Sequence, residues 1–152
     1  MIVVISDTHS KSLSELPLHL LKRLEKAELV IHAGDFDTLE FYEELKSFDL
    51  VGVRGNCDDI DIPERVEVEW RGLRIGVRHE ADPDCLVYEA MERDLDIMVF
   101  GHTHVPMLKI VKGIVIVNPG SPKGTVPTFA EIYKDLIVIR TVGGDVIAKG
   151  RR

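Results

Sequence analysis

Seven side chains that could bind a divalent cation stand in short motifs along this chain. They comprise two carboxylates, one amide and four imidazoles: Asp7, His9, Asp35, Asn56, His79, His102 and His104. Oxygen and imidazole donors suit Mn, Fe, Co, Ni or Zn, and a site of this kind needs no thiolate. Seven donors exceed what one ion takes. Because Asp35 is the one ligand candidate in its motif, we expect it to bridge two ions.

The segment before each motif is rich in Val and Ile, which is typical of a buried strand. These segments are residues 1–6, 29–33, 50–54, 73–78 and 97–100. In an open α/β sheet, ligands bind in the crevice beyond the carboxyl ends of the strands. We therefore expect the five motifs to converge on one place. Two metals about 3.5–4 Å apart could clamp the attacking and leaving oxygens of an in-line displacement.

Together the motifs resemble those of the calcineurin-like metallophosphoesterase superfamily, and in particular its small archaeal and bacterial phosphodiesterase branch. The resemblance rests on Asp7-x-His9, Gly34-Asp35, Gly55-Asn56-Cys57-Asp58, His79 and Gly101-His102-Thr103-His104. It extends from residue 1 to about Ser121 and includes the loop Asn118-Pro119-Gly120-Ser121. Each motif is weak alone, but five in this order are specific.

The resemblance implies a role for each candidate ligand. The first metal would be held by Asp7, His9 and His104, the second by Asn56, His79 and His102, and Asp35 would bridge the two. The implied activity is hydrolysis of a phosphate ester, most often a small phosphodiester, by in-line attack of a metal-bridging hydroxide. The expected catalytic residues are His102, Asn56 and Asp35. Manganese is the first choice of metal, with Ni, Co, Fe and Zn as alternatives.

Two positions depart from the family pattern. Cys57 stands where larger members have a His that acts as proton donor or phosphate contact, and Glu80 follows His79 where many members have Gly. Because no strong general acid is evident, we expect a leaving group of low pKa, such as an aryl alcohol, to be favoured.

Several other polar residues have both a functional and a structural interpretation. His32 lies inside a predicted strand, and we expect it to orient a metal ligand and not to bind the metal itself. Asn56 could instead adopt a left-handed conformation beside Gly55, and Cys57 could line the site or be a small buried thiol. The remaining residues point to structural roles: His19 to helix packing or solvent exposure, Asp58 and Asp59 to capping of a turn, and Ser121 to a loop without a nucleophile elbow.

The expected fold is α/β, a four-layer α/β/β/α sandwich of two mixed sheets flanked by helices. Helices are predicted after Pro17, Thr38 and Asp82, and the third is expected to turn Leu86, Val87, Ala90 and Met91 inward. Alternation of strand and helix predicts a mainly parallel first sheet. Hairpin turns are predicted at Arg71-Gly72, Lys112-Gly113 and Lys134-Asp135, and residues 143–144 and 150–152 as a loose tail.

Length and composition set the broad class. A chain of 152 residues with 45% apolar residues predicts one domain, and the resemblance implies that it is a metallophosphoesterase domain over residues 1–152. No long apolar stretch or leader is evident, and Cys57 and Cys85 are too few for a disulfide framework, so we expect a cytoplasmic protein with no membrane partner. The absence of Gln and the presence of only two Asn are typical of thermophile proteins.

Two other function classes are alternatives to a phosphoesterase. The retromer vacuolar-sorting subunit resembles this fold, uses its surfaces to bind partner proteins and has an eroded metal site, but the complete ligand set here favours an enzyme. A nuclease is disfavoured because the net charge of −7 opposes binding of a nucleic-acid polymer. Edge strands in the second half of the chain could pair in a homo-oligomer.

Overall fold

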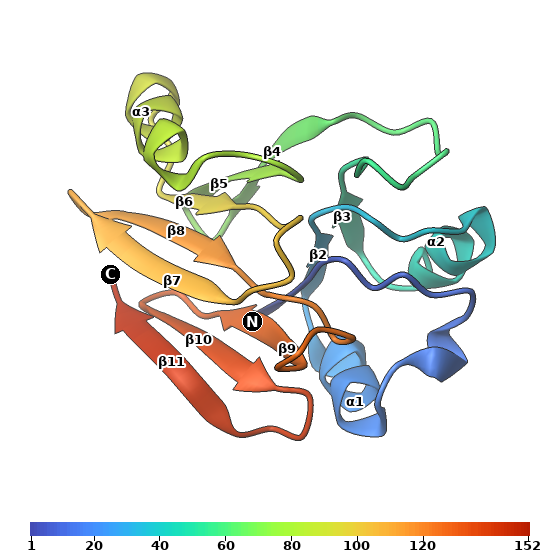
Figure 1. Cartoon of the computed structure of the whole chain (residues 1–152). Coiled ribbons are helices and arrows are strands. Elements are labelled where there is room, and N and C mark those ends of the chain that lie inside the picture. The colour runs from blue at the N-terminus through green and yellow to red at the C-terminus, as the bar shows by residue number, and fades with distance from the viewer.

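Two β-sheets lie face to face in the computed structural model, which describes residues 1–152 (Figure 1). The first sheet has the strand order β11-β10-β9-β1-β2-β3 and the second β4-β5-β6-β8-β7. The strands are β1 (Ile2–Ile5), β2 (Leu29–His32), β3 (Leu50–Gly52), β4 (Arg65–Trp70), β5 (Leu73–Arg78), β6 (Ile97–Val99), β7 (Met107–Val111), β8 (Ile114–Asn118), β9 (Thr128–Ile132), β10 (Leu136–Thr141) and β11 (Val146–Arg151). Both sheets mix parallel and antiparallel pairs.

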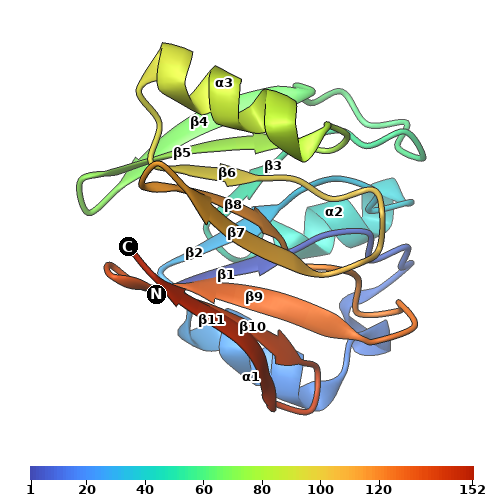
Figure 2. The ribbon, with the colours of Figure 1, turned by 60° about the vertical axis from the view of Figure 1, so that its left-hand side comes forward.

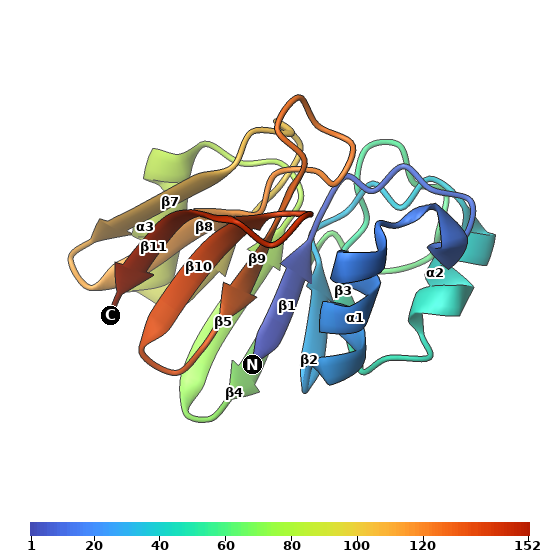
Figure 3. The same ribbon diagram turned by 90° about the horizontal axis from the view of Figure 1, so that it is seen from below.

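Helices cover the two outer faces, which confirms the predicted four-layer α/β/β/α sandwich (Figure 3). Helices α1 (Leu18–Lys26) and α2 (Leu39–Leu45) pack on the first sheet, and α3 (Pro83–Arg93) packs on the second. A short 3₁₀ helix, Leu13–Glu15, precedes α1. The expected caps are present: Thr38 accepts a hydrogen bond from the Phe41 N–H, and Asp82 accepts one from the Asp84 N–H.

The core between the sheets is built from β-branched and other aliphatic side chains. Ile2 and Val4 of β1 face Val77 of β5 and Val99 of β6, and all four are buried. Burial of such side chains stabilises the fold by about 25 cal/mol for each Å² of apolar surface that is removed from water. This core therefore holds the two sheets at a fixed separation, and the loops that leave them inherit that geometry.

The parallel strands of both sheets end on the same side of the molecule. β1, β2 and β3 are parallel in the first sheet, as are β5, β6 and β8 in the second. In Figure 2 the loops that follow β1 and β6 leave the sandwich together, on the side away from the two termini. The five motif-bearing loops therefore meet at one edge of the sandwich.

Three expectations about the elements are wrong. The first sheet is parallel only across β1, β2 and β3, because β9, β10 and β11 add to it in antiparallel fashion. Residues 143–144 form the turn of a hairpin whose second strand is β11, and Gly150 pairs with Ile137. Met91 is half exposed, because at 100° per residue it lies well round the helix from Leu86 and Ala90.

The hairpin turns are confirmed. Arg71 and Gly72 both have a positive φ, as do Lys112 and Gly113, which is the geometry of the two-residue turns that match strand twist. The helices are all too short and too polar to cross a bilayer.

Candidate metal centre

The loops after five strands bring all seven candidate ligands together. Asp7 and His9 follow β1, Asp35 follows β2 and Asn56 follows β3, so these four come from the first sheet. The other three come from the second sheet: His79 follows β5, and His102 and His104 follow β6. Two overlapping clusters result, one of Asp7, His9, Asp35 and His104 and one of Asp35, His79 and His102. Within each cluster the donor atoms lie within 4.8 Å of one another.

The first cluster places two imidazoles against two carboxylates. His9 Nε2 lies 3.4 Å from His104 Nε2 and 3.7 Å from Asp35 Oδ2. His104 Nε2 lies 3.3 Å from Asp7 Oδ1. Four donor atoms thus surround one small volume, as they would around a single cation.

In the second cluster, His79 lies at the centre. Its Nε2 lies 3.2 Å from Asp35 Oδ2, 2.7 Å from Asn56 Oδ1 and 3.3 Å from His102 Nδ1. Asn56 Oδ1 is also 3.1 Å from His102 Nδ1. Asn56 has a negative φ, so the left-handed alternative for this residue is wrong. Asp35 is the residue that belongs to both clusters.

One oxygen atom tests directly whether these residues fit a cation. Asp7 is fully buried, and its Oδ2 accepts hydrogen bonds from Ser6 Oγ at 2.7 Å and from the His102 N–H at 2.9 Å. Its Oδ1 is also buried but has no hydrogen-bond partner. Buried polar atoms are nearly always paired. An unpaired carboxylate oxygen among imidazole nitrogens therefore fits a divalent cation.

Neighbouring groups fix how the imidazoles point. His9 Nδ1 lies 2.8 Å from Asp37 Oδ1, and His79 Nδ1 lies 2.7 Å from the Ala33 carbonyl oxygen, to which it donates. Each contact occupies one ring nitrogen and leaves Nε2 for the cluster, as is usual for metal-binding His residues. Sequence reasoning missed Asp37, although its place two residues after Asp35 was a signal.

Asp58 ties two of the loops together. Its Oδ2 accepts from the N–H groups of Asp35 and Gly55, both at 2.8 Å, and its Oδ1 accepts from the Asp37 N–H at 3.0 Å. The expectation that Asp58 merely caps its own turn is therefore wrong. Its carboxylate sets the relative position of the loops that carry Asp35 and Asn56.

The backbone of the centre is strained. Asp7, His9, Asp35, His102 and His104 all have φ between 43° and 73°. This left-handed region costs an ordinary residue about 1–2 kcal/mol. Strain of this kind collects at functional sites, where the surrounding structure holds it.

Electrostatics differ between the two carboxylates. Burial raises the pKa of Asp7 above its ordinary value, and hydrogen bonds from Ser6 only partly offset this. Burial would also raise the pKa of Asp35, but the hydrogen bonds from His79 and the Cys57 N–H hold it below the ordinary range. Burial lowers the pKa of His79, but its hydrogen bonds to Asp35 and the Ala33 carbonyl oxygen, together with the charges of Asp35 and Asp7, outweigh burial and raise the pKa. Two carboxylates in a buried site thus favour a positive partner, either a proton on His79 or a cation.

The sequence did not decide the roles of three further residues, which the structure now places. His32 is buried; its Nδ1 accepts from the Gly34 N–H at 3.0 Å, and its Nε2 lies 2.9 Å from Thr8 Oγ1, so it orients the loop before Asp35. Cys57 is exposed, which makes the buried-thiol alternative wrong. Glu80 is exposed, and its Oε1 lies 3.7 Å from His102 Nε2, with His79 still directed into the second cluster.

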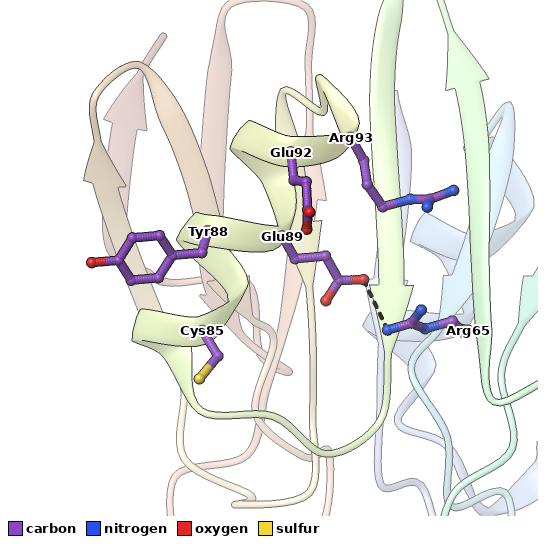
Figure 4. Close-up of a pocket in the computed structure, with 6 residues that line it drawn as sticks. All are labelled: Arg65, Cys85, Tyr88, Glu89, Glu92 and Arg93. Atoms are coloured by element: carbon purple, nitrogen blue, oxygen red, sulfur yellow. Dashed lines mark ion pairs between the residues drawn. The ribbon is translucent and has the colours of Figure 1, made fainter.

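A larger cavity, of about 660 Å³, lies away from these ligands, between β4 and α3. Figure 4 shows Arg65 paired with Glu89 and the Tyr88 side chain pointing away from them. None of its lining residues belongs to a cluster of metal-binding side chains. The site with metal-binding side chains is therefore the region around Asp35 and not this larger cavity.

Sequence comparison gives a consistent result. The profile of the calcineurin-like phosphoesterase superfamily domain matches residues 1–136. A probable metallophosphoesterase of Methanocaldococcus jannaschii is 35% identical over 135 residues, which cover 84% of this chain and 69% of the relative. A phosphodiesterase of the same organism is 26% identical over 134 residues, which cover 77% of this chain and 81% of the relative.

Solved structures agree. A predicted phosphoesterase of Streptococcus pneumoniae matches with a TM-score of 0.77 and 27% identity, covering 99% of this chain and 97% of that chain. Vacuolar protein sorting 29 of Entamoeba histolytica, in a complex with zinc, matches with a TM-score of 0.78 and 28% identity and the same coverage. Fold, donor clusters and sequence all agree: the chain belongs to the calcineurin-like phosphoesterase superfamily.

Proposed function

We propose that this protein is a metal-dependent phosphodiesterase that works with two divalent cations. The observation that carries the proposal is the sharing of Asp35 by two donor clusters, together with the unpaired buried oxygen of Asp7. Because the ligands come from loops along the whole sandwich, the proposed catalytic unit is a single domain over residues 1–152. The phosphodiesterase among the relatives supports a diester substrate.

In this proposal the first cation is held by Asp7, His9, Asp35 and His104, and the second by Asp35, Asn56, His79 and His102. When bound, such cations lower the pKa of water and stabilise negative charge on a phosphoryl group. Mn²⁺ is the proposed metal, since the oxygen and imidazole donors suit it; Zn²⁺ is the main competitor because the similar vacuolar sorting structure contains it.

The exposed residues beside the second cluster determine which leaving groups the proposed enzyme can expel. The side chain of His102 is 39% exposed and directs Nε2 toward solvent and Glu80. Although Cys57 is exposed, local desolvation of its thiol and the charge of Asp35 raise the pKa, so this residue is a poor proton donor at neutral pH. We therefore expect aryl esters, whose alcohols have a low pKa, to be hydrolysed faster than alkyl esters.

The proposal is tested with chelator-stripped protein to which Mn, Ni, Co, Zn or Mg is added back singly. Hydrolysis of bis(p-nitrophenyl) phosphate is compared with that of p-nitrophenyl phosphate. We expect metal-restored turnover of the diester, its loss in Asp35→Ala, and a fall of roughly a hundredfold or more in His102→Ala. The matched imidazole control is His19→Ala, because His19 lies on α1 beside Phe129, outside both clusters.

A binding module is the second candidate, since vacuolar protein sorting 29 shares the fold. The complete set of seven donors favours the hydrolase. Stoichiometric metal binding without turnover of either ester would reverse this preference and assign the centre to partner binding.

A further inference from the structure

We infer that the substrate is an asymmetric phosphodiester, with one polar, hydroxyl-bearing ester group and one partly apolar ester group. The inference rests on the proposed phosphodiesterase function and specifies its substrate class. It is carried by two cavities of different chemistry, which adjoin the metal-ligand clusters at different ends.

The first cavity, called the polar cavity, has a volume of about 290 Å³ and adjoins Asn56 and His79. No apolar side chain lines it. Its other side chains are two arginines and two glutamates, Arg54, Arg78, Glu64 and Glu80, so their formal charges cancel. A wall of this kind does not select a second anion, nor does it favour an acyl chain.

Hydrogen-bonding groups are dense in the polar cavity. Arg54 Nη2 donates to Glu64 Oε1 at 2.7 Å, and both side chains remain partly exposed. The planar guanidinium carries five donors and the carboxylate accepts from several directions. Neighbouring hydroxyl groups can satisfy both at once, so the chemistry fits the glyceryl or sugar part of an ester.

The second cavity, called the apolar cavity, has a volume of about 410 Å³ and adjoins His104. Val105, Pro106 and Val126 line it. Val105 is 63% exposed and Val126 45% exposed, so both present apolar surface to the cavity. Lys123 also lines it, but its ammonium is held by the His9 carbonyl oxygen at 2.6 Å and by Glu15 at 3.1 Å. Its alkyl chain is thus left for contact with an apolar group.

The two cavities lie against different clusters. The polar cavity touches His79, a member of the second cluster, and the apolar cavity touches His104, a member of the first. Asp35 is the one residue that the clusters share. A phosphate bound beside Asp35 would direct one ester group into each cavity, and the difference in lining would decide which group goes where.

The test uses manganese-loaded protein and two substrates with the same p-nitrophenyl leaving group, glyceryl p-nitrophenyl phosphate and methyl p-nitrophenyl phosphate. We expect kcat/KM for the glyceryl ester to exceed that for the methyl ester by about tenfold, as for a site built to hydrogen-bond substrate hydroxyls. Arg54→Ala should bring this ratio to within about twofold. Arg71→Ala is the matched control, since Arg71 pairs with Glu28 outside the polar cavity, and it should keep the ratio.

Two more variants test each cavity separately. Glu64 lies in the loop before β4, outside the ligand motifs. Glu64→Gln should lower the glyceryl-to-methyl ratio of kcat/KM by about threefold. This variant keeps the test valid if Arg54→Ala loses metal. Val126→Ser should raise KM for both esters by about threefold and keep their ratio, because both carry the same aryl group. Bound metal is measured for every variant.

The experiments distinguish failure of this inference from failure of the proposed phosphodiesterase function. Hydrolysis of both esters at similar kcat/KM by the unaltered protein overturns the asymmetric substrate and leaves the phosphodiesterase standing. A change of the ratio in Val126→Ser, or an unchanged ratio in both Arg54→Ala and Glu64→Gln, also overturns it. Absence of any diester hydrolysis with every metal overturns the phosphodiesterase and this inference together.

Discussion

Asp58 shows how a residue without a place in the ligand set can control it. One carboxylate satisfies three backbone N–H groups, those of Asp35, Asp37 and Gly55. These groups belong to the loops after β2 and β3, which the chain itself joins only through α2 and β3. The carboxylate is therefore the direct link that sets Asp35 against Asn56.

We expect Asp58→Ala to weaken metal binding by about 10–100-fold, because outer residues that orient ligands have effects of this size. Leaving buried N–H groups unpaired should also lower the free energy of unfolding by about 1–3 kcal/mol. Titration calorimetry with Mn²⁺ and urea unfolding measure the two effects. The control is Asp59→Ala, since Asp59 is exposed and makes no such contact. Equal affinities of the two variants would contradict the role given to Asp58.

At this scale the sequence predicted which candidate donor groups come together far better than it predicted the residues that support them. Asp7, His9, His102 and His104 stand in recognisable spacings directly after apolar strands, so their convergence could be predicted. Ser6 and Asp37 act through contacts with residues at other positions, Ser6 on Asp7 and Asp37 on His9. Nothing in a local pattern predicts which carboxylate oxygen will be occupied and which will be left free.

At the scale of elements, the loops after β1 and β6 approach so closely that a side chain would not fit between them. A Cβ atom on Gly101 would lie 2.0 Å from Ser6 Oγ and 2.8 Å from Asp7 Oδ2. The two loops belong to different sheets. The absence of a side chain at Gly101 thus allows His102 and His104 to reach Asp7.

Gly101→Ala should separate the loops and lower the free energy of unfolding by about 1–3 kcal/mol, as overpacking does. Metal binding to the first cluster should fall with it, since Asp7 and His104 come from the separated loops. The matched control is Gly143→Ala, where a Cβ atom meets nothing closer than Thr141 Oγ1 at 3.8 Å. Thermal unfolding and Mn²⁺ titration of both variants measure these two effects. Normal metal binding by Gly101→Ala would show that close approach of the two loops is not needed for the first cluster.

The elements themselves could be predicted where a pattern is local. Thr38 and Asp82 are caps, and the positive φ at Arg71-Gly72 and Lys112-Gly113 follows from residue type and position. Pairing between distant strands is different. Alternation and apolar runs tell which residues are buried but not which sheet edge they join, so β9 beside β1 could not be foreseen. β11 was not predicted, because Gly150 and the charged residues around it are typical of a flexible tail. In the structure, this segment forms a strand because its backbone pairs with β10.

At the scale of the whole molecule, each proposed cation would connect the two sheets. The first cluster takes Asp7, His9 and Asp35 from the first sheet and His104 from the second. The second cluster takes Asp35 and Asn56 from the first sheet and His79 and His102 from the second. Away from these loops, the aliphatic core between the sheets and the ion pairs Arg71–Glu28 and Arg152–Asp96 also connect them. Metal binding should therefore stabilise the sandwich as a unit.

Removal of metal should lower the melting temperature substantially. A ligand at 100 times its Kd stabilises the folded state by about 2.7 kcal/mol, and a chain of this size gains about 2–4 °C per kcal/mol. Each cation should then contribute about 5–11 °C, measured by calorimetric scans of Mn²⁺-loaded and chelator-treated protein. His104→Ala should lose the part due to the first cluster and keep the part due to the second, whereas His19→Ala should keep both. An equal melting temperature with and without metal would mean that the clusters do not connect the sheets, because any cation bound across them must favour the folded state.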